Sequence, residues 1–331
     1  MKDEKIIVSI CCITYNHEKY IRQAIDSFLM QKTNFKYEII IHDDASTDNT
    51  ADIIREYEKK YPDIIKPIYQ TENQYSKGKK PSYITIKEAR GKYIAFCEGD
   101  DYWCDENKLQ IQVDYMEKNP ECSFCFHNAK IYDMKIEDFT KNFLPQSKEQ
   151  IKYIKNNGIY NLAEIARLDA IPTASYFFRN NHEYPDWYNS AIAGDLCMQL
   201  INSYYGYAYY IDKVMSVYRV GTNQSMMDKW GRDSKEDYWK ASNLLKGYIK
   251  IYENINEFSG YKYKNTFDKM TANVNIQMAF INPEIEFSNV KYKETLKNTD
   301  YNIKIKIKFI LRIKFKNTYM LLKKIKNIIK K

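Results

Sequence analysis

Short apolar runs alternate with amphipathic segments through the first 130 residues of the chain. The amphipathic segments place apolar residues three and four positions apart, which predicts helices with one buried face. Continuous apolar strands separated by helices predict a mostly parallel sheet that helices cover on both faces, an α/β fold. The predicted strands span residues 6–13, 37–41, 64–69, 92–97 and 123–127, and the predicted helices span residues 18–31, 48–61, 82–90 and 108–118.

The second half of the chain has a weaker pattern. Residues 133–157 are polar and lack a clear period, so we expect a loop or an excursion there. We divide the chain into an α/β domain at 1–225, with halves at 1–130 and 131–225, and a helical C-terminal region at 226–331. The strand-like runs of this half are 171–178 and 207–218, and its helical segments are 195–204, 235–258 and 264–280.

Basic charge is concentrated at the C-terminus. The formal net charge is +8, but residues 304–331 contain eleven Lys or Arg and no acid, so the remainder is slightly acidic. We therefore expect no nucleic-acid partner. No run approaches the ~20 apolar residues of a membrane span. The seven cysteines and the absence of a long apolar segment at the N-terminus predict a cytoplasmic protein with free thiols.

Polar residues follow the first two predicted strands, where ligands of parallel sheets bind. Thr14, Tyr15 and Asn16 end the first strand and either face a ligand crevice or cap the next helix. Asp43 and Asp44 follow three isoleucines, and carboxylates so close to a core need partners. Capping of a helix explains one acid of this stretch, and an Asp at a strand end can accept from a base or ribose.

Three acids follow the fourth strand within four residues, namely Glu98, Asp100 and Asp101. They would repel one another without a cation, and hard oxygen ligands suit Mg²⁺ or Mn²⁺. The intervening Gly99 would let the backbone approach a ligand closely. The alternative is a solvated acidic turn. Because the chain has no glycine-rich dinucleotide motif and no Walker A motif, a bound diphosphate would need a cation at these acids.

In this order, the strand ends resemble those of the family 2 glycosyltransferases. The resemblance rests on Thr14-Tyr15-Asn16, on the stretch from Ile39 to Asp48 and on the stretch from Gly91 to Trp103, and it covers roughly residues 5–225. It implies the GT-A fold, in which a Rossmann-like nucleotide-binding half is continuous with an acceptor half. It also implies an inverting transfer from a nucleotide-sugar donor, with UDP as the expected nucleotide.

The resemblance also implies roles for single residues on the donor side. Glu98 and Asp100 stand where the family has its Asp-x-Asp motif, and the glutamate is a departure that keeps the carboxylate. Asp100 would bind the metal directly, and Glu98 would contact the ribose or a metal-bound water. The donor-binding set is Thr14, Tyr15, Asn16, Asp43, Asp44, Glu98, Gly99, Asp100, Asp101 and Arg219, with Asp44 on the base or ribose.

Asp195 follows Gly194 at the start of a predicted helix, where the family places its catalytic base. The alternative is a helix N-cap, because a carboxylate at a helix N-terminus is stabilised by the dipole. Asp186 and Glu183 are weaker candidates for the base. The residues expected on the acceptor side are Trp103, Thr173 and Ser175.

Gly221 is a second departure from the family. The run from Tyr218 to Gly221 resembles the family's Tyr-Arg-x-His element, but glycine replaces the histidine that often completes metal or phosphate binding. Asn223 or water could substitute, and Arg219 would contact phosphate or pair with a surface acid. The isolated His17, His127 and His182 are expected to be structural.

The resemblance implies a glycan or lipid-linked acceptor in cell-surface polysaccharide synthesis. A sugar-1-phosphate nucleotidyltransferase and a non-catalytic sugar-nucleotide-binding scaffold are the alternatives. Residues 302–331 combine apolar and basic positions at helical spacing, which suits an anionic membrane surface. The expected location is therefore the inner face of the plasma membrane. Alternatively the tail packs on the body, or residues 304–308 form an edge strand.

Overall fold

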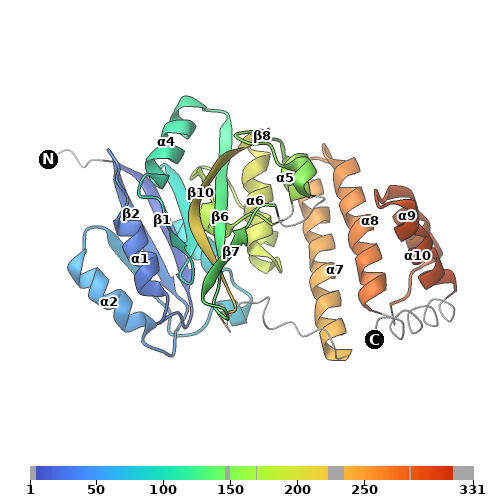
Figure 1. Cartoon of the computed structure of the whole chain (residues 1–331), viewed down its shortest axis with the longest axis horizontal. Helices are drawn as coiled ribbons and strands as arrows, with labels where there is room; N and C mark the ends of the chain where they lie inside the picture. Colours follow the sequence, from blue (N-terminus) through green and yellow to red (C-terminus); the bar gives the residue numbers. More distant parts are fainter. Residues whose placement is uncertain (1–4, 146–149, 169, 223–234, 283–284, 316–331) are drawn as a thin grey trace. The chain divides into compact units, whose positions relative to one another are not determined.

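The computed structural model describes residues 5–145, 150–168, 170–222, 235–282 and 285–315 (Figure 1). The chain divides into two compact units. Unit 1 comprises Met1–Ser190 with Gly194–Ser225, and unit 2 comprises Ala191–Ala193 with Met226–Lys331.

Unit 1 is built on one mostly parallel sheet with helices on both faces, as predicted. Its strands follow the order β3-β2-β1-β4-β9-β6-β10-β5, and the first four of these are mutually parallel. Their carboxyl ends therefore meet at one edge of the sheet. The elements of this half are β1 (Ile6–Thr14), α1 (Ile21–Leu29), β2 (Lys36–Asp43), α2 (Thr50–Lys60), β3 (Ile65–Tyr69), α3 (Pro81–Glu88), β4 (Tyr93–Glu98), β5 (Tyr102–Trp103) and α4 (Lys108–Lys118).

Two expectations for the second half were wrong. The polar stretch 133–157 contains β7, which forms an antiparallel pair with β6, and a short 3-10 helix at Gln150–Tyr153. The apolar run 171–178 is mostly not a strand: Thr173–Ser175 is a 3-10 turn, and only the short β9 enters the sheet, antiparallel to β4 and β6. The elements are β6 (Cys122–Asp133), β7 (Asp138–Asn142), β8 (Ile159–Tyr160), α5 (Leu162–Leu168), β9 (Phe177–Arg179), α6 (Gly194–Tyr204) and β10 (Tyr207–Val220).

Unit 2 is helical. Its helices are α7 (Lys235–Phe258), α8 (Lys264–Ile281), α9 (Asn289–Asn298) and α10 (Ile303–Lys314). Phe309 of α10 is buried against Ile276 and Ala279 of α8, and Arg312 donates through Nε to the Ala279 carbonyl at 3.0 Å. Residues 304–308 are therefore helical and not an edge strand. Within the described residues, every helix is too short or too polar to span a bilayer.

Lys108 is the least expected core residue of unit 1. Its side chain is fully buried at the start of α4, where Nζ donates to Gln112 Oε1 at 2.7 Å and lies 4.0 Å from the centroid of the Trp103 ring. Burial lowers the pKa of Lys108 to about 7. The sequence pattern had placed only apolar residues of this helix inside.

We expect Lys108 to make the stability of the fold depend on pH. An unfolded lysine keeps its proton to about pH 10.4. The folded chain releases the proton of Lys108 near pH 7. Between these values the unfolded state binds more protons, so this residue makes the free energy of unfolding rise with pH, by about 1 kcal/mol per pH unit. Relative to the Lys108→Met variant, the wild type should therefore gain stability from pH 7 to pH 9 in urea titrations.

The matched control is Lys118→Met, which removes an exposed lysine from the other end of the same helix. Its stability should run parallel to that of the wild type across this pH range. Parallel curves for Lys108→Met as well would contradict the burial of a titrating amine.

Candidate active site

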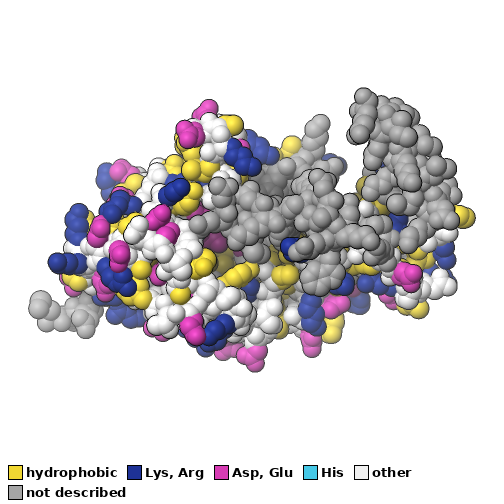
Figure 2. Space-filling view, turned by 90° about the horizontal axis from the view of Figure 1, so that it is seen from below, with side chains coloured by type: hydrophobic (Ala, Val, Ile, Leu, Met, Phe, Trp, Pro, Cys, Tyr) yellow, Lys and Arg dark blue, Asp and Glu magenta, His cyan; other side chains and the backbone are white. Residues whose placement is uncertain are grey.

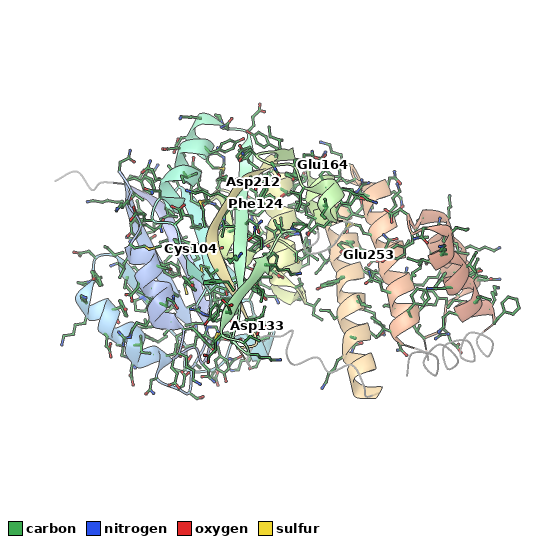
Figure 3. The ribbon with its side chains drawn as sticks, in the orientation of Figure 1. Cys104, Phe124, Asp133, Glu164, Asp212 and Glu253 are labelled. Carbon is green, nitrogen blue, oxygen red and sulfur yellow. The ribbon has the colours of Figure 1, made fainter. Side chains whose placement is uncertain are left out.

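The candidate site lies at the carboxyl edge of the sheet. The strand register places Thr14 beside Asp43 and Ile13 beside Glu98, so the ends of β1, β2 and β4 are neighbours. In Figure 3 the label of Asp133, the last residue of β6, marks this lower edge, and Phe124 marks the body of the same strand. The topology thus brings together the strand ends that the sequence analysis singled out.

Hydrogen bonds hold the loops after β1 and β2 together. The Asn16 amide donates to Ser46 Oγ at 2.8 Å, and the Thr47 amide donates to Asn16 Oδ1 at 2.7 Å. Asn16 has φ +56°, a left-handed conformation that asparagine tolerates. Asp43 accepts from the hydroxyl and the amide of Ser46. Asn16 and Asp43 therefore order these two loops, and their contact with a donor stays a prediction.

Asp44 orders a further loop. Its two carboxylate oxygens accept from the backbone amides of Gln74 and Tyr75 at 2.7 and 3.0 Å. The side chain is buried, and each oxygen keeps a second lone pair. The expected contact with a base or ribose is compatible with this arrangement and stays a prediction.

The acids after β4 form a poorly solvated cluster. Burial, and then the charges of Asp100 and Asp195, raise the pKa of Glu98 to about 8. Burial and the neighbouring Asp100 and Glu98 also raise the pKa of Asp101 well above its usual range. Asp101 Oδ1 accepts from the Arg219 amide at 2.9 Å, while Oδ2 is buried and has no hydrogen-bond partner among the described residues.

Arg219 supports this acidic turn from β10. Its guanidinium donates to the backbone carbonyl of Asp100 and to the side chain of Gln23. It lies 4.6 Å from the centroid of the Tyr102 ring and is almost fully buried. Pairing with a surface acid does not describe these contacts, and the phosphate contact stays a prediction.

Asp195 reaches the same cluster from α6. It lies in the first turn of that helix, and its charge contributes to the raised pKa of Glu98. The Tyr176 hydroxyl is 3.4 Å from the Asp195 backbone carbonyl, and burial followed by the charges of Asp195 and Glu98 raises its pKa well above the usual range. Burial raises the pKa of Tyr218, and the charges of four carboxylates add to this effect. These are Asp101, Glu98, Asp100 and Asp195. The sequence analysis assigned no role to either tyrosine, although Tyr218 begins the run that resembles the family's Tyr-Arg-x-His element.

The cluster fits a divalent cation that the substrate helps to hold. The orphaned Oδ2 of Asp101 and the raised pKa of Glu98 show that negative charge here lacks compensation. Yet no set of three or more Asp, Glu, His or Cys side chains in the described parts of the chain could hold a metal ion alone. A cation here would complete its shell with water and substrate phosphates, as Mg²⁺ does in many phosphate-binding sites.

The three residues expected on the acceptor side are inside the fold. Trp103 is buried and donates through Nε1 to the Ala174 carbonyl at 2.9 Å. Ser175 is buried and donates through its hydroxyl to the Pro172 carbonyl at 2.6 Å. Thr173 is slightly exposed. These contacts shape the segment that joins the sheet to the acceptor side, and direct acceptor contacts stay predictions.

Figure 2 views the molecule from this lower side. On its described surface, basic and acidic side chains are interspersed and form no continuous basic strip in that view.

Residues 9–182 match the family model described as Glycosyl transferase family 2. An uncharacterised protein of Mycobacterium tuberculosis, Rv1520, is 37% identical over 215 residues, 64% of this chain and 58% of that protein. This chain therefore aligns with less than two thirds of that relative's length. The Escherichia coli UDP-Glc:alpha-D-GlcNAc-diphosphoundecaprenol beta-1,3-glucosyltransferase WfgD is 32% identical over 182 residues, 55% of this chain and 68% of the enzyme. A crystal structure of S. aureus TarS with UDP-GlcNAc has the same fold, with a TM-score of 0.59, 16% identity, and coverage of 93% of this chain and 82% of that one.

Close packing explains why position 99 is a glycine, a constraint that the sequence analysis did not anticipate. A β-carbon at this position would lie 2.9 Å from both Cβ and Oγ1 of Thr14 and 3.0 Å from Cδ1 of Ile21. We expect Gly99→Ala to lower the free energy of unfolding by about 1–3 kcal/mol, because the acidic turn must move away from β1. Urea titration measures this.

Gly194→Ala is the matched control for that variant, because the added carbon would have its nearest neighbour at 3.5 Å. If both variants were as stable as the wild type, close packing of the acidic turn on β1 would be ruled out.

Proposed function

Because this chain belongs to glycosyl transferase family 2 and has its GT-A fold, we propose that it transfers a sugar with inversion from a UDP-linked donor to a hydroxyl group. The acceptor is a glycan or lipid-linked saccharide of cell-surface polysaccharide synthesis. The observation that carries the proposal is the convergence of Glu98, Asp100 and Asp101 from β4 with Asp195 from α6. This set provides both a site for a cation with a diphosphate and a separate carboxylate for the acceptor.

The donor's nucleoside occupies the crevice between the loops after β1 and β2. Thr14, Tyr15 and Asn16 form one wall, and Asp43 and Asp44 form the other, joined by the hydrogen bonds of Asn16 to Ser46 and Thr47. UDP as the nucleotide is supported by the donor in WfgD's name and by the UDP-GlcNAc bound to TarS. The N3–H group of uracil can donate a hydrogen bond to the carboxylate of Asp44.

The diphosphate lies over the acidic turn, with Mg²⁺ or Mn²⁺ on Asp100 and with Glu98 on the ribose or on a metal-bound water. When bound, the cation neutralises the charge of the leaving nucleoside diphosphate. Gly99 and Asp101 shape this turn, and Arg219 positions it through the Asp100 carbonyl. Two carboxylates and a diphosphate are a sufficient ligand set for such a cation.

Asp195 acts as the general base. It accepts the proton of the acceptor hydroxyl while that oxygen forms a bond to C1 of the donor sugar. The bond between C1 and the diphosphate oxygen breaks at the same time, and the electron pair leaves with the nucleoside diphosphate. Attack opposite to the leaving group inverts C1. Thr173 and the segment around Trp103 and Ser175 line the acceptor side.

A peripheral position on an anionic membrane brings the site to a lipid-linked acceptor at the cytoplasmic face. Within unit 2, α10 has two apolar faces. Phe309 is buried against α8, whereas Ile303 and Ile307 are 68% and 49% exposed, beside the exposed Lys304 and Lys308. An exposed apolar stripe flanked by lysines suits a surface of anionic lipids. The remainder of the predicted tail, residues 316–331, lies outside the described residues.

Asp100→Asn and Asp195→Asn should separate donor binding from chemistry. We expect Asp195→Asn to bind UDP with Mn²⁺ as the wild type does, but to lower the hydrolysis or transfer of a UDP-sugar about 10²–10⁴-fold, since it lacks the base. Asp100→Asn should weaken Mn²⁺-dependent UDP binding and lose turnover. Calorimetry with UDP and a screen of UDP-sugars measure the two quantities.

Asp138→Asn, which changes an exposed acid on β7, serves as the control. If Asp195→Asn kept near wild-type turnover and Asp186→Asn lost turnover, Asp186 would be the base instead. A wild type that binds UDP and turns over no nucleotide-sugar would instead favour the non-catalytic scaffold.

We expect replacement of the exposed stripe of α10 to reduce membrane binding. The double variant Ile303→Ser and Ile307→Ser removes two apolar side chains, and its partition onto vesicles with anionic lipids should fall about tenfold or more. Sedimentation with such vesicles, at low and high salt, measures this. The control pair Ile136→Ser and Ile159→Ser removes isoleucines of unit 1 that are 63% and 52% exposed. Equal sedimentation of both double variants would exclude α10 as the contact.

A further inference from the structure

His17 lies beside the acid that would hold the cation. It follows Asn16 in the loop between β1 and α1, and its Nε2 is 4.0 Å from Asp100 Oδ2. The His17 carbonyl accepts from the amides of Tyr20 and Ile21 at 2.9 Å, which ties this residue to the start of α1. The backbone is thus fixed while the imidazole faces the acidic turn.

The imidazole has no hydrogen bond within the described residues. Its Nδ1 is buried without a partner, and the distance from Nε2 to Asp100 exceeds a hydrogen bond. Only 13% of the side chain is exposed. Leaving a buried polar group without a partner is destabilising. Such a group at the mouth of a site indicates that a ligand supplies the interaction that the protein does not.

The distance between the two side chains fits one shared cation. Ligand atoms lie about 2.1 Å from Mg²⁺, and imidazole nitrogens lie at similar distances from Zn²⁺. Two ligands can therefore be up to about 4.2 Å apart across one ion. The observed 4.0 Å between Nε2 and Oδ2 is within this limit, and a small approach would bring them to adjacent positions of an octahedron.

Residue 221 is unable to supply the histidine that the family often has. Gly221 adopts φ +76°, a left-handed conformation in which a histidine would be strained. A β-carbon there would also meet Lys135 and Asp133, so a side chain at 221 would point to the turn between β6 and β7. Position 221 therefore offers no nitrogen ligand to a cation at the acidic turn.

We propose that His17 would hold the divalent cation together with Asp100, as its nitrogen ligand, in place of the histidine absent at position 221. This assignment rests on the proposed metal-dependent glycosyltransferase function. It also predicts which divalent metal the site prefers. Mg²⁺ takes oxygen ligands almost exclusively, whereas transition metals accept imidazole, so His17 favours Mn²⁺ over Mg²⁺.

Pulsed electron paramagnetic resonance of the full chain with Mn²⁺ and UDP tests the contact directly. The wild type should show ¹⁴N modulation from a directly bound imidazole, and His17→Ala and His17→Gln should lose it. Calorimetry should show Mn²⁺ affinity in the presence of UDP falling about tenfold or more in both variants, with Mg²⁺ affinity changed less than twofold. A residue needed only for folding would weaken both metals alike.

His182→Ala is the matched control. Its ring is stacked on Tyr205 and lies beyond β9, whose last residue pairs with Tyr93 at the opposite edge of the sheet. This variant should keep the ¹⁴N signal and the affinity for Mn²⁺. Wild-type binding of Mn²⁺ without ¹⁴N modulation would overturn the role of His17 and leave the proposed function standing. Absence of any Mn²⁺ or Mg²⁺ binding with UDP would overturn both.

Discussion

Uncompensated negative charge at the carboxyl edge of the sheet is the constraint on which the site depends. Glu98, Asp100, Asp101 and Asp195 are close enough to influence one another, and burial raises the pKa of Glu98 to about 8. Arg219 directs its guanidinium to a backbone carbonyl and to Gln23, and its charge offsets only part of the rise in the pKa of Asp101. The carboxyl groups of Glu98 and Asp101 therefore keep raised pKa values unless positive charge arrives from outside.

This constraint links donor binding to catalysis. A nucleoside diphosphate alone would add negative charge to the cluster, and a cation alone would find too few protein ligands among the described residues. The two together satisfy the cluster, because the phosphates complete the cation's shell and the cation screens the acids from one another. In the proposed mechanism the same screening would reduce the repulsion between Asp195, the proposed base, and Glu98.

The donor side of the site could be predicted from sequence because parallel β-strands impose an order. Each strand of this half is continuous in sequence and ends at one edge, so Asp43, Asp44 and the acids after β4 had to meet there. The pattern could not show which hydrogen bonds these side chains already make within the protein. Asp44 holds the amides of Gln74 and Tyr75, a contact across thirty residues that leaves no local signal. His17 was similarly hidden, because an isolated histidine acquires meaning only from the distance to Asp100.

The acceptor side was harder to predict for a physical reason. In this part of the sheet, parallel and antiparallel neighbours are mixed. The three-residue β9 lies between β4 and β6, and the polar strand β7 forms a hairpin with β6. Exposed polar strands and short antiparallel insertions carry little periodicity, so hydropathy misses them. Trp103 and Ser175, which were expected on the acceptor side, illustrate the result, because both are buried and their hydrogen bonds to Ala174 and Pro172 left no signal in the sequence. The part of the sheet from β3 to β4 is thus defined by parallel strands whose order fixes where the acids lie. The rest of the sheet depends on short antiparallel strands and on a turn whose backbone these buried side chains hold.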